Sequence, residues 1–356
     1  MKKQGSLKIA AMAAAMVGFF ALGFSPLYAG GKADTGSAAG SATKGAPEAG
    51  ASSAPAVQAP LIGIAKIVAH PALDALEKGI KEEVSAAYPS AKFDLQNANG
   101  EPATASQIAQ KFKLEKVNIA VGIATPTAMA LANVITDIPV IYSAVTDPVA
   151  AGLVKSFDQG GPNITGTSDL PPVEGQIDTL IELVPGIKRI GHVYNAGEAN
   201  SVTTAKKAAD YCASKGIQFV TAVVANSAEV SQALTSLVGR VDGIYLSTDN
   251  TVFSAISTVA DICLKNKLPL VTADPSSAET VPVLAAVGFN YYEMGRATGR
   301  IVVEVLKGKK TSDIPTYFAK DPKEQSLVIN LDVAKTLGIT VPQDLVKRAS
   351  LVIQSK

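Results

Sequence analysis

Clusters of polar residues recur along the chain, and their residue types are those that bind a small charged molecule. Each cluster places hydroxyl, amide or carboxylate groups within a few positions of one another. Such groups supply hydrogen-bond donors, acceptors and negative charge. The candidate binding residues are His70, Asn97, Thr125, Thr127, Asp147, Asn200, Ser201, Asp249, Asn250, Asp274 and Tyr291.

The chemistry of these groups suits a zwitterion. Thr125 and Thr127 open a predicted helix, where free backbone N–H groups and the helix dipole attract a carboxylate. Asp147, Asp249 and Asp274 offer partners for an ammonium group, because a desolvated cation needs a carboxylate.

Helix capping is the alternative explanation for each cluster taken alone. Ser, Thr, Asp and Asn are the preferred N-cap residues, and every cluster precedes a predicted helix. Runs such as Thr125-Pro-Thr127 and Ser247-Thr-Asp-Asn-Thr251, however, carry more donors and acceptors than one helix end can use. The set as a whole therefore favours binding.

Signatures of catalysis are missing from the sequence. It has two histidines, and His192 lies inside an apolar strand, where it is expected to be a core residue. The chain has no G-x-S-x-G elbow, no P-loop and no H-E-x-x-H motif, and neither cysteine has a metal-ligand neighbour. We expect no cofactor, no bound metal and no enzymatic activity.

Strands and helices alternate from Leu61 onward, which predicts parallel sheets covered by helices. Polar clusters follow the strands, and ligands of open α/β sheets bind beyond the carboxyl ends of strands. The first unit is predicted to have strands at 61–68, 91–96, 117–122 and 138–142, with helices at 72–87, 103–114 and from 126. The stretch that ends at Gly166-Thr-Ser-Asp169 is predicted to be a polar connection between the first unit and the next.

The alternation then repeats, which predicts a second unit of similar size. Its predicted helices are 173–183, 199–215, 228–237 and 252–265, and its strands are 189–194, 219–224, 243–246 and 269–271. A strand from Val283, a helix over 291–307, a strand at 326–329 and two short helices complete the chain. Tyr291 falls at a predicted hinge, where it packs either on a ligand or within the hinge.

The predicted fold class is α/β, with two Rossmann-like lobes whose parallel sheets flank a cleft. The N-terminal lobe comprises 61–168 and about 288–320, and the C-terminal lobe comprises 169–287 and about 321–356. Three hundred residues after the leader are too many for one ordinary core and suit two domains.

The N-terminus has the pattern of an export signal. Residues 1–29 combine Lys2, Lys3 and Lys8 with an apolar run and a permissive cleavage site, and 30–60 form a Gly/Ala/Ser-rich disordered linker. A retained N-terminal anchor is the alternative. We therefore predict a periplasmic or extracytoplasmic protein, in which Cys212 and Cys263 are either disulfide-bonded or free and buried.

Several motifs in combination resemble one family. They are His70-Pro-Ala-Leu-Asp74, Gly122-Ile-Ala-Thr-Pro-Thr127, Ala144-Val-Thr-Asp-Pro148, Tyr194-Asn195, Glu198-Ala-Asn-Ser201, Ser247-Thr-Asp-Asn250, Gly288-Phe-Asn-Tyr-Tyr292, Val328-Ile-Asn330 and Leu337-Gly-Ile339. From about Ile62 to the C-terminus, the chain resembles the ABC transporter substrate-binding proteins of the tryptophan/tyrosine (TrpX-like) group.

The resemblance implies a type I periplasmic-binding-protein fold, capture of an amino acid by lobe closure, and ABC permease subunits as partners. Trp, Tyr and Phe are the ligands best represented in the family. Thr125 and Thr127 would hold the carboxylate, and Asp249 with Asn250 would contact the ligand from the second lobe. Asp147 and His70 would line the same cleft.

Other functions fit the sequence less well than a receptor. A net charge of +1 without a basic cluster excludes nucleic acid as a partner, and we expect a monomer. A sugar or nucleoside ligand would want stacking rings, and the chain lacks tryptophan. A ligand-binding sensor protein remains an alternative function, whereas a repressor would need a DNA-binding segment before residue 60.

Overall fold

The computed structural model describes residues 59–320 and 324–355. The predicted signal peptide and all but the last two residues of the predicted linker lie outside this range. No helix within the described part is long and apolar enough to cross a membrane.

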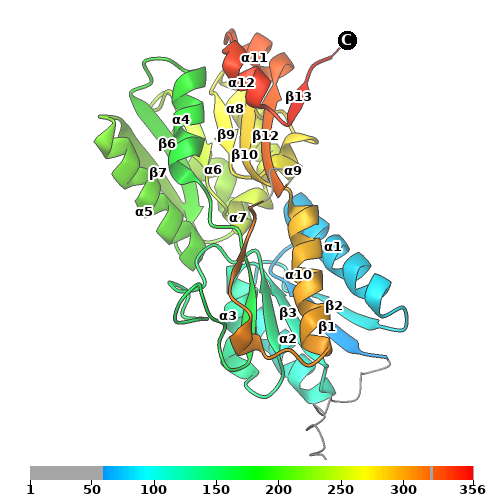
Figure 1. Cartoon of the computed structure of the whole chain (residues 1–356). Helices are drawn as coiled ribbons and strands as arrows, with labels where there is room; N and C mark the ends of the chain where they lie inside the picture. Colours follow the sequence, from blue (N-terminus) through cyan, green and yellow to red (C-terminus); the bar gives the residue numbers. More distant parts are fainter. Residues whose placement is uncertain (1–58, 321–323, 356) are drawn as a thin grey trace, which may run out of the picture. The chain divides into compact units, whose positions relative to one another are not determined.

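The N-terminal lobe is a six-stranded, wholly parallel sheet in the order β2-β1-β3-β4-β5-β11. Helix α1 packs along α10, while α2 and α3 lie together on the other face (Figure 1). The elements are β1 Leu61–Lys66, α1 Pro71–Ala87, β2 Lys92–Asn97, α2 Pro102–Glu115, β3 Ile119–Ile123, α3 Thr125–Val134, β4 Val140–Ser143, β5 Ile164–Ser168, α10 Tyr291–Leu306, a 3₁₀ turn at Thr311–Asp313 and β11 Tyr317–Phe318.

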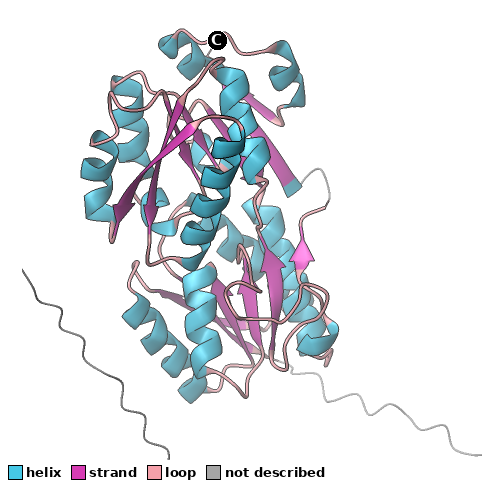
Figure 2. Ribbon diagram, turned by 90° about the vertical axis from the view of Figure 1, so that its left-hand side faces the viewer, coloured by secondary structure: helices cyan, strands magenta, loops and turns pink. Residues whose placement is uncertain are grey.

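The C-terminal lobe contains a seven-stranded sheet in the order β7-β6-β8-β9-β10-β12-β13, with helices on both faces (Figure 2). The elements are α4 Val173–Leu183, β6 Arg189–Asn195, α5 Ala199–Ser214, β7 Gln218–Val224, a 3₁₀ turn at Ser227–Glu229, α6 Val230–Thr235, β8 Gly243–Leu246, α7 Asn250–Phe253, α8 Ile256–Lys265, β9 Leu270–Thr272, α9 Pro275–Ala278, β10 Ala285–Phe289, β12 Gln325–Asn330, α11 Leu331–Leu337, α12 Gln343–Arg348 and β13 Leu351–Ile353.

The fold class predicted from the sequence is confirmed. The chain passes between the two sheets three times, after β5, after β10 and between β11 and β12. Each sheet has apolar clusters of its own, one in the first lobe and one on each face of the second. Cys212 and Cys263 are free and buried, in α5 and α8, as small apolar residues of two of these clusters.

Two local predictions were wrong. The stretch before Asp169 contains the buried strand β5, whose threonines find partners inside the lobe, as Thr165 does with the Ile314 carbonyl. The helix predicted over 252–265 is two helices, because the backbone leaves the helical region at Ala255. The four strands predicted for the second unit are parallel, and β12 adds a strand that runs antiparallel to β10.

The contact between α1 and α10 is unusually close. A Cβ atom at Gly295 would lie 2.4 Å from the carbonyl oxygen of Leu76, and one at Gly79 would lie 2.3 Å from that of Tyr292. Only glycine allows two helix backbones to approach so near. This contact fixes the helix that follows the second passage between the lobes.

Candidate functional site

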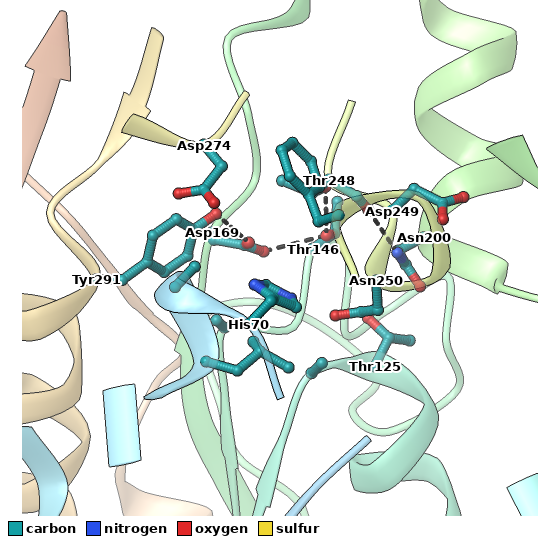
Figure 3. Close-up of a pocket in the computed structure, with 15 residues that line it drawn as sticks. His70, Thr125, Thr146, Asp169, Asn200, Thr248, Asp249, Asn250, Asp274 and Tyr291 are labelled. Atoms are coloured by element: carbon teal, nitrogen blue, oxygen red, sulfur yellow. Dashed lines mark hydrogen bonds between the residues drawn. The ribbon is translucent and has the colours of Figure 1, made fainter. Parts of the chain in front are cut away.

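A buried cavity lies between the lobes, at the carboxyl ends of strands from both sheets (Figure 3). This is the position expected for a ligand of open α/β sheets. Its lining residues are His70, Ala72, Leu73, Ala124, Thr125, Ala144, Thr146, Asp169, Asn200, Thr248, Asp249, Asn250, Phe253, Asp274 and Tyr291.

The lobes approach each other closely around this cavity. The Thr146 and Thr248 hydroxyl oxygens are 3.4 Å apart, in a hydrogen bond from one lobe to the other. The rings of His70 and Phe253 face each other from opposite lobes, with their centroids 6.1 Å apart and their planes tilted by 33°. The cleft is therefore in a nearly closed arrangement.

Helix α3 begins at the cavity with unsatisfied donors. No side chain caps it, and its N-cap residue, Ala124, has φ 73° and ψ 159°. This backbone conformation is strained for any residue except glycine, and such strain concentrates at binding sites. The Thr125 hydroxyl is buried without a hydrogen-bond partner among the described residues. The start of α3 thus offers a hydroxyl and backbone amides to an anionic group.

Glu198 holds the second lobe's side of the cavity in place. Its carboxylate accepts hydrogen bonds from the Asn250 side chain at 2.5 Å and from the Thr251 amide and hydroxyl at 2.9 and 2.8 Å. The Asn200 side-chain NH₂ donates to the Thr248 carbonyl at 2.7 Å. Its Oδ1 is left buried without a partner in the described part of the chain.

Two of the three lining carboxylates are engaged as helix caps. Asp249 accepts from the Asn195 amide at 2.6 Å and, as the N-cap of α7, from the Val252 amide at 2.8 Å. Burial, and then the charge of Glu198, raises the pKa of Asp249 to about 7. Asp274 caps α9 by accepting from the Ser276 amide at 2.8 Å.

Asp169 is the third carboxylate, and it caps no helix. It lies just after β5 and accepts hydrogen bonds from two hydroxyl groups, those of Thr146 and Tyr291, each at 3.1 Å. Asp169 is only 4% exposed, and burial raises the pKa of its carboxyl group to about 6. Within 59–320 and 324–355 no cation is paired with it. It is a buried acceptor of positive charge.

His70 is the cavity's nitrogen-bearing ring. It is 8% exposed, and neither ring nitrogen has a hydrogen-bond partner among the described residues. Burial lowers its pKa, although the nearby Asp274 charge opposes this shift. His70 is therefore neutral at pH 7 and presents one donor and one acceptor to the cavity.

Seven of the residues predicted from the sequence meet at the cavity. They are His70, Thr125, Asn200, Asp249, Asn250, Asp274 and Tyr291. Their roles toward a ligand stay predictions. The sequence interpretation did not select Asp169, Thr146, Thr248 and Phe253; Asp169 would have followed from the rule of strand ends, had β5 been recognised.

Four predicted residues do not line the cavity. The Thr127 hydroxyl donates to the Ile123 carbonyl at 2.7 Å, within its own lobe. Asp147 accepts from two amides of its own turn and borders a small adjoining cavity. Asn97 accepts from the Asn99 amide, and Ser201 is buried behind Asn200.

The fold and the interlobe cavity define a two-lobed binding protein, and comparison with known proteins gives its family. Residues 61–353 match the family model described as ABC transporter substrate binding protein. The chain belongs to this family, as its motifs indicated.

Relatives with stated ligands are among the proteins similar to this chain. A protein named tyrosine-binding protein, from Clostridioides difficile, is 38% identical over 282 residues, which are 78% of this chain and 81% of that one. The ABC domain in complex with L-Trp from Streptococcus pneumonia is 33% identical, covers 83% of this chain and 99% of its own, and has a TM-score of 0.78.

The lobe arrangement also has counterparts. The ligand-free, open structure of a substrate binding protein with adhesive properties from Clostridium difficile is 35% identical and covers 83% of this chain and all of its own, but its TM-score is 0.61. The L-Trp complex, at similar identity and coverage, fits better. These values accord with the close approach of the lobes, and they confirm the type I periplasmic-binding-protein fold.

Proposed function

We propose that the protein is the extracytoplasmic receptor of an ABC importer, and that it captures an aromatic amino acid between its lobes for delivery to the permease. One observation carries the proposal. The interlobe cavity contains buried polar atoms without partners among the described residues, namely Thr125 Oγ1, Asn200 Oδ1 and the ring nitrogens of His70. Buried polar groups are normally hydrogen-bonded, so a ligand is expected to complete them.

The arrangement of donors and acceptors suits a zwitterion. The Thr125 hydroxyl and the first amides of α3 would receive the carboxylate, because helix N-termini attract anions. Asp169 and the free Oδ1 of Asn200 would accept from the ammonium group. This assignment replaces Asp249 as the main ammonium partner, because Asp249 accepts two backbone amides and caps α7, whereas Asp169 accepts from side-chain hydroxyl groups and caps no helix in the described structure.

The rings of His70 and Phe253 would contact the aromatic side chain. Their centroids are 6.1 Å apart, and a third ring stacked between them needs about 7 Å, because each contact between carbon atoms takes about 3.5 Å. A ring therefore fits between them only when the lobes are more open than in this structure, and closure onto the ligand is a population shift driven by contacts that the ligand makes with both lobes. The tyrosine and L-Trp named for two relatives support an aromatic ligand.

Delivery to a permease is what membership in the family implies, and no catalytic chemistry is part of the proposal. The segment 1–29 would direct export, so that the receptor meets its ligand outside the cytoplasmic membrane.

Isothermal titration of purified protein, freed of bound ligand, with the twenty amino acids tests the function. We expect at least one of Trp, Tyr and Phe to bind with a Kd of about 1 μM or lower, equivalent to about −8 kcal/mol. Thr125→Val, which keeps the shape of the side chain, should weaken binding about tenfold or more through the lost hydrogen bond. Asp261→Asn, at an exposed position on α8, is the control. Failure of all three aromatic amino acids to bind contradicts the proposal.

A further inference from the structure

The cavity is strongly asymmetric in charge. Three carboxylates line it, those of Asp169, Asp249 and Asp274, whereas no lysine or arginine is among its lining residues. Of the described residues that line it, His70 is the one basic side chain, and burial holds it neutral. The ion pairs of the described residues lie elsewhere, as between Lys66 and Asp74 at the start of α1.

The two charged ends of an amino acid therefore meet unequal partners. A ligand ammonium group would face the buried carboxylate of Asp169, whose side-chain donors in the described part of the chain are the hydroxyl groups of Thr146 and Tyr291. Charge-assisted hydrogen bonds of this kind are about twice as strong as neutral ones. A ligand carboxylate would face only the neutral Thr125 hydroxyl and the start of α3, whose dipole amounts to about half a charge.

Desolvation increases the difference. A buried carboxylate without a cation is costly, because the charge loses water and gains no opposite charge. Asp169 is buried and has no paired cation among the described residues, so a ligand ammonium group would relieve this cost. A ligand carboxylate would have no such cation and would lie near three acidic side chains.

We propose that recognition rests on the ligand's ammonium group, so that the same cavity also binds aromatic primary amines, which are aromatic amino acids without the carboxylate. This inference rests on the proposed function for the ring pocket of His70 and Phe253. It adds a class of ligand that carries a net positive charge. The Asn200 Oδ1 atom would accept from this ammonium group as well.

Three matched ligands test the inference by titration at pH 7.5: L-tryptophan, tryptamine and 3-indolepropionic acid. If L-tyrosine binds best, the matched amine is tyramine and the matched acid is 3-(4-hydroxyphenyl)propionic acid. If L-phenylalanine binds best, they are phenethylamine and 3-phenylpropionic acid. We expect the amine to bind within about tenfold of the amino acid, and the acid to bind at least about a hundredfold more weakly, as expected for loss of a buried charged hydrogen bond.

Two results would overturn the inference: an acid that binds as tightly as the amino acid, or an amine that fails to bind where the amino acid binds. Absence of binding by Trp, Tyr and Phe refutes the proposed function instead, and amine binding in that case would assign the cavity to amines alone. The two failures are thus distinguishable.

Variants separate the two ends of the ligand. Thr125→Val should weaken binding of the amino acid and leave the affinity for the amine unchanged, because the amine has no carboxylate at α3. Asp169→Asn should weaken both, and Asp261→Asn neither. Equal weakening of both ligands by Thr125→Val would contradict the assignment. Circular dichroism spectra of each variant exclude misfolding as the cause.

Discussion

Replacing Asp169 by asparagine should stabilise the ligand-free protein while it weakens ligand binding. The carboxylate is buried and has no cation among the described residues, so its ionised form is a cost to the folded state. Burial is the dominant cause, and the hydrogen bonds from Thr146 and Tyr291 offset it only in part. Asparagine has nearly the same shape and carries no charge.

The pKa of Asp169 gives the magnitude. It rises from the ordinary 3.8 to about 6. Since one pKa unit corresponds to about 1.4 kcal/mol, ionised Asp169 lowers the free energy of unfolding by about 3 kcal/mol above pH 6. Asparagine keeps one oxygen acceptor and loses the other, so we expect a net gain of about 1–3 kcal/mol at pH 7.5.

The sign of the pH dependence follows from proton binding. Between pH 6 and pH 4 the folded protein holds a proton on Asp169 that the unfolded chain has released, so this residue's contribution to stability rises as the pH falls. The variant lacks this contribution. The stability difference between Asp169→Asn and wild type should therefore be largest above pH 6 and shrink toward pH 4.

Urea unfolding of the ligand-free proteins, followed by circular dichroism from pH 4 to pH 8, measures this difference. Asp261→Asn, which removes an exposed carboxylate, should not change stability at any of these pH values. A loss of stability in Asp169→Asn at pH 7.5, or a difference independent of pH, would show that Asp169 is paired in the ligand-free protein. The reasoning about the ammonium partner would then be wrong.

Three further substitutions test other parts of the structure. His192 is buried, its Nε2 has no partner among the described residues, and burial lowers its pKa to about 4. Acid should therefore lower the free energy of unfolding of wild type by about 3 kcal/mol between pH 6.5 and 4, and His192→Phe should remove this loss, as urea unfolding at each pH would show. Gly295→Ala forces a Cβ against the Leu76 carbonyl and should lower the free energy of unfolding by about 1–3 kcal/mol, measured in the same way. Glu198→Gln replaces a carboxylate oxygen that accepts from the Asn250 side chain by an NH₂ donor. This substitution should weaken ligand binding about tenfold in titrations and leave the circular dichroism spectrum unchanged.

Much of the fold could be predicted because its strands are short apolar runs between amphipathic helices. The helix at Val173–Leu183 and the strand at Gly243–Leu246 have the predicted bounds. Here hydrophobic periodicity and tertiary packing agree. The direction of β12 could not be predicted, because a lone strand's sequence does not specify whether its neighbour runs parallel or antiparallel.

Strand β5 was missed for a different reason. Its sequence, Ile164-Thr-Gly-Thr-Ser168, has one apolar residue, yet all five positions are buried. Thr165 donates to the Ile314 carbonyl, and the Thr167 hydroxyl hydrogen-bonds with that of Thr298. Both partners lie more than a hundred residues away in the sequence. The pattern of hydrophobic residues does not predict such a strand, because the hydrogen-bond partners of its polar groups lie on segments that are distant in the sequence.

Because strand β5 was not recognised, Asp169, on which ligand binding is proposed to rest, was not selected either. The residues selected from the sequence were polar residues between a strand and a helix. Such residues cap the helix that follows, and their oxygens accept its amides, as in Asp249 at α7 and Asp274 at α9. Asp169 follows an unrecognised strand and precedes Leu170-Pro171-Pro172, so no helix begins there and its carboxylate caps nothing. A strand-end carboxylate without a helix to cap keeps its charge available. For a ligand with an ammonium group, that availability matters more than the number of polar residues nearby.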